Sequence, residues 1–310
     1  MDSLLTDLKS LGLIVLILVG LPIVVIGGIS LCVIVGDAVA KRFPRRRRAG
    51  QNAGEFRVVR SRLNRLARPT WLLTPTQARG FSKLGGDPDL PLAIDWPDGA
   101  KSPRAFLAQI DLAEAPARGA LDWLPAEGRL YFFWDDWRAG FADEVRVVHS
   151  LDAAGEPRSP PPGLAVKQRF GERRAAFLSM TSIPSLDWLG VDYGDLDVSE
   201  DELDQLAEMP HEPFGDELQH RIGGYPCEIQ GVCMPLECEH LARGLKYDYE
   251  AEIPPAIARA SKSWRLLLQI DTDPALKMQW GDGGRLYVFV RAQHARAGDF
   301  SKTVTISQCY

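Results

Sequence analysis

Leu107-Ala108-Gln109-Ile110-Asp111 and Leu267-Leu268-Gln269-Ile270-Asp271 are two copies of one pattern, and they decide the fold of this chain. Each copy follows a Gly-Gly pair and precedes a Trp and a Gly-Arg-Leu-Tyr run. These landmarks are Gly85-Gly86, Trp123 and residues 128–131 in the first copy, and Gly223-Gly224, Trp280 and residues 284–287 in the second. An internal repeat of this kind indicates two related units that bury a common core.

Short apolar or β-branched runs, bounded by Gly, Pro and Asp, predict β-strands throughout the repeats. We expect strands at residues 106–111, 130–134, 145–148, 176–180, 266–271, 286–290 and 304–307. Helices are expected at residues 55–67, from Ser199 to Pro210, and at about 255–261. These elements predict an α+β fold that is β-rich and internally duplicated, forming one pseudo-symmetric domain.

The N-terminal part of the chain predicts a membrane anchor. Residues 11–35 carry no charge, and about 20 apolar residues suffice to span a bilayer. The cations that come after them favour a cytoplasmic C-terminal side. A cleaved signal peptide is the alternative, but the apolar stretch is long and the start carries Asp2 and Asp7. We therefore expect one transmembrane helix, in a single-pass protein of the inner (cell) membrane.

This interpretation divides the chain into four segments. They are a short tail at 1–10, the transmembrane helix at 11–40, a basic juxtamembrane segment with a helix at 41–78, and the duplicated domain at 79–310. Within the basic segment, a membrane-surface position is expected for Arg45, Arg46, Arg47 and Arg48. These side chains either set topology or bind anionic lipid headgroups.

The overall charge argues against a nucleic-acid partner. The chain has 41 Asp and Glu against 36 Lys and Arg, and a block of the cations precedes the repeats. The duplicated domain is therefore acidic, and an acidic surface repels a phosphate backbone.

The repeat landmarks resemble the YwqG-like family, a bacterial domain of unknown function. The resemblance covers roughly residues 79–310, and its motifs are at residues 82–91, 96–97, 106–112, 128–133, 220–226, 229–230, 264–271, 280–287 and 299–301. It implies a β-rich α+β fold and assigns neither an activity nor catalytic residues. Some relatives are neighbours or immunity partners of bacterial toxins, which adds an immunity-type function to the hypotheses.

Paired Gln and Asp side chains are the first candidate site. Alternation along a strand places Gln109 and Asp111 on one face, and Gln269 and Asp271 likewise. We expect Phe106, in contrast, on the opposite face with Ala108 and Ile110. Across a pseudo-twofold axis the four polar groups predict a ligand cleft between the repeats. The alternative is that they bond to loop amides inside each repeat.

His220 and Arg221 extend this candidate cleft, because they stand directly before Gly223-Gly224. Histidine is the commonest general base, and glycine permits close backbone approach. A histidine before a Gly-Gly turn also suits a loop-bracing role, and both interpretations stay open.

Cysteines offer a weaker candidate. Cys227, Cys233, Cys238 and His240 lie close together, but their spacing lacks the C-x2-C hairpin of zinc sites. We expect reduced thiols in the cytoplasm rather than a metal site, and we expect no cofactor.

The sequence contains no G-x-S-x-G, H-E-x-x-H, kinase or P-loop pattern. We therefore expect a membrane-anchored cytoplasmic binding or interaction domain, with another protein as the first hypothesis for its partner besides the lipid bilayer. Two alternatives remain: an uncharacterised enzyme with a site at the interface of the repeats, and an immunity-type partner of a bacterial toxin. A small-molecule ligand and the oligomeric state are not predicted.

Overall fold

The computed structural model describes residues 66–135, 144–152, 155–184, 219–230, 233–248 and 251–310. All of them belong to one compact unit, Asn52–Tyr310. The expected tail, transmembrane helix and arginine block lie outside the described residues. The helix expected from Ser199 to Pro210 and nearly all of the one expected at 55–67 lie outside them too.

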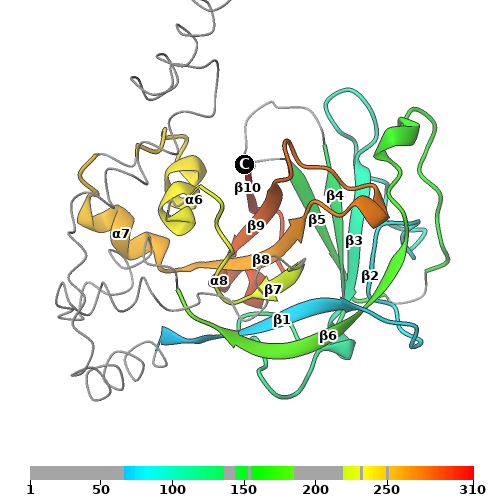
Figure 1. The fold of residues 1–310 in the computed structure, drawn as a ribbon, viewed down its shortest axis with the longest axis horizontal. Helices are drawn as coiled ribbons and strands as arrows, with labels where there is room; N and C mark the ends of the chain where they lie inside the picture. The colour runs from blue at the N-terminus through cyan, green and yellow to red at the C-terminus, as the bar shows by residue number, and fades with distance from the viewer. Residues whose placement is uncertain (1–65, 136–143, 153–154, 185–218, 231–232, 249–250) are drawn as a thin grey trace, which may run out of the picture. The chain divides into compact units, whose positions relative to one another are not determined.

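One antiparallel sheet of ten strands dominates the described part of the chain (Figure 1). In chain order the strands are β1 (Arg68–Pro75), β2 (Lys83–Leu84), β3 (Ala105–Asp111), β4 (Arg129–Trp134), β5 (Val145–Ser150), β6 (Arg173–Ser182), β7 (Arg221–Gly223), β8 (Trp264–Asp271), β9 (Arg285–Arg291) and β10 (Val304–Gln308). The seven strands predicted within the repeats are present. Strands β1, β2 and β7 were not predicted.

The strand order shows the repeat directly. It runs β10-β9-β8-β7-β1-β6-β2-β3-β4-β5, so the pair β1–β6 occupies the centre. On one side the first repeat contributes β2 to β5, and on the other the second repeat contributes β7 to β10 in mirrored order. The two repeats therefore share one continuous sheet rather than forming separate layers.

The predicted α+β class is wrong, because helices contribute little to the fold. The described helices are α6 (Met234–Ala242), α7 (Pro255–Ser261) and α8 (Ala292–Arg296), with 3-10 turns η1 (Leu112–Glu114), η3 (Val166–Gln168) and η5 (Pro274–Leu276). The helix predicted at 255–261 is confirmed as α7. The central pair of strands, of which β1 was missing from the prediction, joins the repeats into a barrel-like sheet instead of a helix-covered layer.

The predicted single-pass membrane architecture is also corrected. Within the described ranges, no helix has the length and apolar character needed to cross a bilayer. The longest described α-helix, α6, has nine residues, whereas about 20 are required. The predicted span, residues 11–40, is not among the described residues.

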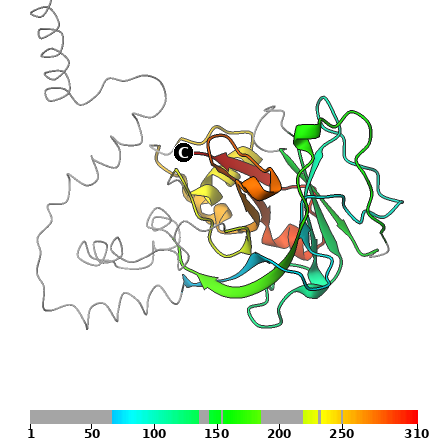
Figure 2. The same cartoon turned by 45° about the vertical axis from the view of Figure 1, so that its right-hand side comes forward.

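The sheet curls until its two ends meet, as Figure 1 and Figure 2 show. Side-chain hydroxyl groups of β10 make the connection. The backbone N–H of Val145 donates to Thr305 Oγ1 (3.1 Å), and Ser307 Oγ donates to Glu144 Oε2 (2.9 Å). These bonds satisfy edge groups that would otherwise be open to pairing with another chain.

A β-bulge at the same place in each repeat alters the predicted side-chain faces. The register of β3 on β4 shifts between Phe106 and Ala108, and that of β8 on β9 shifts between Leu266 and Leu268. Leu107 and Ala108 consequently both belong to the main interior core, whereas Phe106 packs in a separate cluster. The prediction that Phe106 shares a face with Ala108 is wrong, because a bulge adds one residue to the alternation.

The outer face of the sheet is covered differently in the two repeats. In the first repeat, Leu90 and Trp96 from the loop between β2 and β3 pack on Phe106 and its neighbours. In the second repeat, Met234 and Cys238 of α6 cover the equivalent surface. The additional length of the second repeat thus forms helices that close this face.

We predict that Thr305→Val weakens the closure of the sheet. Thr305 and Val145 are both buried, so the substitution leaves the Val145 N–H without its acceptor. The expected loss in the free energy of unfolding is about 1–3 kcal/mol, measured by urea denaturation. Thr181→Val, at an exposed position of β6, is the matched control and should change stability by less than about 0.5 kcal/mol. Equal stability of the two variants would show that the Thr305 hydrogen bond does not help to close the sheet.

Candidate functional site

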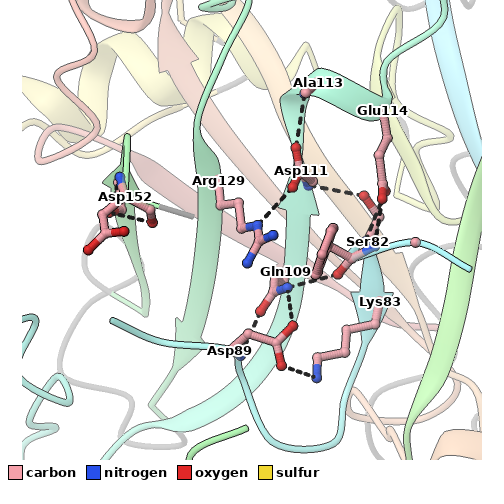
Figure 3. Close-up of polar contacts among 12 residues, drawn as sticks. Ser82, Lys83, Asp89, Gln109, Asp111, Ala113, Glu114, Arg129 and Asp152 are labelled. Atoms are coloured by element: carbon pink, nitrogen blue, oxygen red, sulfur yellow. Dashed lines mark hydrogen bonds and ion pairs between the residues drawn. The ribbon is translucent and has the colours of Figure 1, made fainter. Parts of the chain in front are cut away.

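The Gln109 side chain holds the loop after the Gly85-Gly86 turn (Figure 3). Its Oε1 accepts from the Asp89 N–H (2.8 Å), and its Nε2 donates to the Phe81 carbonyl and to Asp89 Oδ2 (both 2.8 Å). Tyr131, opposite Gln109 on β4, donates its hydroxyl to the Asp89 carbonyl (2.8 Å). Both backbone polar groups of Asp89 are therefore satisfied by strand side chains.

The second repeat holds its loop in the same way. Gln269 Oε1 accepts from the Cys227 N–H (2.9 Å), and its Nε2 donates to the Gln219 carbonyl (3.1 Å). Tyr287 donates its hydroxyl to the Cys227 carbonyl (2.5 Å). Asp89 and Cys227 occupy equivalent positions, so the Gln of each repeat motif is a loop-bracing residue.

The Asp of each motif pairs with the Arg of the Gly-Arg-Leu-Tyr run in the same repeat. Arg129 Nε lies 2.7 Å from Asp111 Oδ2, and Arg285 Nε lies 3.1 Å from Asp271 Oδ1. Burial would lower the pKa of both guanidinium groups, but the neighbouring carboxylates outweigh it and raise the pKa. These ion pairs lie at the strand ends and fix β3 to β4 and β8 to β9.

His220 occupies the position that Ser82 has in the first repeat. Each accepts a hydrogen bond from the backbone N–H of the motif Asp: Asp111 N to Ser82 Oγ (3.0 Å), and Asp271 N to His220 Nδ1 (3.1 Å). Because Nδ1 accepts, the ring proton resides on Nε2 and donates to Asp273 Oδ2 (3.2 Å). Both ring nitrogens are engaged, which favours the bracing role over that of a general base.

Asp273 and Arg173 complete this contact and were missed by sequence reasoning. Asp273 is fully buried, caps η5 through the Ala275 N–H, and forms an ion pair with Arg173 of β6. Burial opposes its ionisation, but the His220 hydrogen bond and the Arg173 charge prevail and lower its pKa to about 2. An Asp directly before Pro274 indicates a helix cap, so this role of Asp273 could have been predicted from the sequence. Its partners His220 and Arg173 are distant in sequence, and no local pattern indicates them.

Arg221 is buried in β7, where it pairs with Gln269, and it donates to the Tyr225 carbonyl (3.2 Å). Its equivalent in the first repeat is Lys83, which pairs with Gln109. Lys83 Nζ lies 3.3 Å from both Asp89 and Glu172. The two cations support the Gly-Gly turns from the preceding strand.

The residues predicted to line a cleft thus form one network in each repeat. Gln109 and Asp111 bond to residues of the first repeat, whereas Gln269 and Asp271 bond to residues of the second. A ligand cleft between the repeats stays a prediction.

A groove of about 350 Å³ opens beside the Gly85-Gly86 turn. Its volume is near the lower end of the range for small-ligand sites, about 300–1,000 Å³. None of the four Gln and Asp candidates lines it. Its lining combines aromatic rings and prolines with polar groups: Gly86, Asp87, Trp96, Phe106, Pro157, Pro160, Leu164, Gln168, Arg169, Phe170 and Glu172. These residues come from the loop between β2 and β3, from β3 itself and from the segment between β5 and β6.

The proline wall of the groove is fixed to the opposite loop. Arg158 donates its backbone N–H to the Pro88 carbonyl (2.9 Å) and its Nη1 to the Ile94 carbonyl (2.7 Å). Ser159 Oγ donates to Asp87 Oδ2 (2.8 Å). The floor is equally constrained, because Trp96 and Phe106 both pack edge-to-face on Phe133. The groove is therefore preformed.

The cysteine candidates do not converge on a metal site. Cys238 is fully buried in a cluster on the outer face of the sheet, and burial raises its thiol pKa well above the ordinary value. His240 Nδ1 lies 2.8 Å from the Leu236 carbonyl in the same helix. In the part of the chain that the structure describes, no group of three or more His, Cys, Asp or Glu residues could hold a metal ion.

Fold and site together define a duplicated, barrel-like β domain with one braced loop per repeat and a groove beside the first. The family described as "Domain of unknown function (DUF1963)" matches residues 82–309. The chain belongs to this family. A search of curated proteins found no match.

We predict that Tyr131→Phe and Tyr287→Phe cost similar amounts of stability, because the two hydroxyls make equivalent bonds. Each substitution should lower the free energy of unfolding by about 1 kcal/mol. Since the residues lie in separate repeats, the double variant should show the sum within about 0.5 kcal/mol. Urea denaturation of the three variants measures this. A large cost for one tyrosine and none for the other would show that the bracing is not duplicated.

We predict that Asp273→Asn flattens the acid limb of the stability profile. The pKa of Asp273 is lowered from 3.8 to about 2 on folding, so its ionised form stabilises the fold above about pH 4. That contribution, roughly 2 kcal/mol, is lost as the pH falls from 4 towards 2. Urea midpoints of wild type and variant should differ at pH 6 and converge near pH 2. A difference that is independent of pH would contradict the ion pair.

Proposed function

We propose that the chain is a binding domain that recognises another protein through the groove beside the Gly85-Gly86 turn. The observation that carries this proposal is the groove itself, a preformed cavity of about 350 Å³ with an apolar floor and polar rim. Within the family, we place the chain with the YwqG-like proteins on its Gly-Gly-Asp-Pro and Gly-Gly-Arg-Leu-Tyr runs.

The engagement of the polar candidates favours binding over catalysis. A general base needs a lone pair directed at substrate, but both nitrogens of His220 are occupied by Asp271 and Asp273. Gln109 and Gln269 are committed to loop backbone groups. A motif that the fold requires in both repeats is explained by architecture, so it gives no support to a single reaction centre.

The groove has the properties of a recognition site. Aromatic side chains such as Trp96 and Phe170 supply contact area with little loss of conformational entropy. The bonds of Arg158 and Ser159 hold the wall before any partner arrives. A groove of this size accommodates one or two side chains of a partner rather than a whole domain face.

We predict that filling the groove weakens peptide binding. Heptapeptides, with their C-termini free, would be selected from a display library against the full chain, and their affinities measured by calorimetry. Gln168 lines the groove and Lys167 does not, although both belong to η3. Gln168→Trp should therefore weaken the selected peptides at least about 10-fold, which corresponds to about 1.4 kcal/mol.

Lys167→Trp is the matched control and should bind as the wild type does. Circular dichroism and urea denaturation establish that both variants fold. Selected peptides that bind Gln168→Trp as tightly as wild type, or a selection that yields no binder, would overturn the proposal.

A further inference from the structure

We infer that the groove binds the C-terminal residue of a protein chain, with its carboxylate at Arg169 and Gln168 and its apolar side chain on the aromatic floor. This inference rests on the proposed function and names the chemistry that the groove selects. Some polar side chains of the groove already have a hydrogen-bond or ion-pair partner, and the others are available to a ligand.

The carboxylates of the groove are already engaged. Glu172 is paired with Lys83 Nζ at 3.3 Å, and Asp87 Oδ2 accepts from Ser159 Oγ at 2.8 Å. A Cβ at position 86 would lie 2.3 Å from Glu172 Oε2 and would displace that side chain. Because residue 86 is a glycine, Glu172 keeps its place beside Lys83. A cationic ligand would have to compete with Lys83 for its main partner.

The cation and the amide of the groove are available. Among the residues that the structure describes, Arg169 and Gln168 have no side-chain partner, and both line the groove. A guanidinium presents a planar fork of N–H donors that matches a carboxylate with two parallel hydrogen bonds. The amide of Gln168 adds a further donor beside it. The available polar groups therefore select an anion.

The apolar part of the groove sets the rest of the ligand. Trp96, Leu164 and Phe170 line the groove together with Pro157 and Pro160. An apolar lining of this kind buries most of the surface of a small ligand. In a protein, a carboxylate and a large apolar side chain belong to the same residue only at the C-terminus.

Calorimetric titration of the full chain with three matched probes tests the inference. They are N-acetyl-L-phenylalanine, its neutral carboxamide, and phenethylamine, which share the aromatic body and differ in charge. The acid should bind at least about 10-fold tighter than the amide, because a charge-assisted hydrogen bond is lost in the amide. Arg169→Gln should remove that difference, whereas Lys167→Gln, which removes the adjacent exposed cation, should preserve it.

The outcomes separate the inference from the proposed function. If the amide binds as tightly as the acid, or the amine binds best, and Gln168→Trp blocks the binding, the groove is a ligand site but the carboxylate assignment is wrong. If none of the probes binds, the carboxylate assignment fails while peptides selected from the library still test the groove. A heptapeptide ending in Phe should behave like the acid, and its C-terminal amide like the neutral probe; equal affinity of the two peptides would also overturn the assignment.

Discussion

The backbone after each Gly-Gly turn is the constraint on which the structure depends. Gly85, Gly86, Gly223 and Gly224 all adopt positive φ angles of 62–75°, a conformation that residues with a Cβ rarely adopt. The chain then leaves the sheet, and its N–H and carbonyl groups lose their ladder partners. A Gln and a Tyr from the adjacent strands replace those partners in each repeat. Because unsatisfied buried backbone groups are costly, this bracing fixes where each loop crosses the outer face.

The two repeats share this bracing but differ in the elements that cover the sheet beyond it. In the second repeat the chain forms α6, which closes the outer face with Met234 and Cys238. In the first repeat a loop carrying Trp96 covers part of the same face and leaves a groove against the segment before β6. The groove therefore exists because the covering elements diverged while the sheet was kept. The position of the groove at the point where the symmetry breaks explains why the paired Gln and Asp residues do not line it.

Local pattern in the sequence was enough to predict the longer strands of the repeats, because apolar periodicity and turn residues act over short distances. It was not enough for β2 and β7, which have two and three residues and exist through their neighbours. The bulge at Leu107 places Phe106 and Ala108 on opposite faces, whereas strict alternation predicts that they share one face. The α+β class was wrong because helices contribute little to the fold, and because β1, which joins the repeats at the centre of the sheet, was missed. The Asp273 contact and the groove were missed because their members come together only in the folded chain.

Soaking crystals of the full chain with a library of small apolar fragments, half of them carboxylic acids, would show directly whether the groove is the binding site. Fragments should gather in the groove between Trp96 and Phe170, with acid oxygens at Arg169 Nη atoms. The equivalent surface of the second repeat, which α6 covers, should stay empty. Fragments that instead gather around His220, Asp271 and Gln269 would contradict the groove as the binding site and favour a site between the repeats.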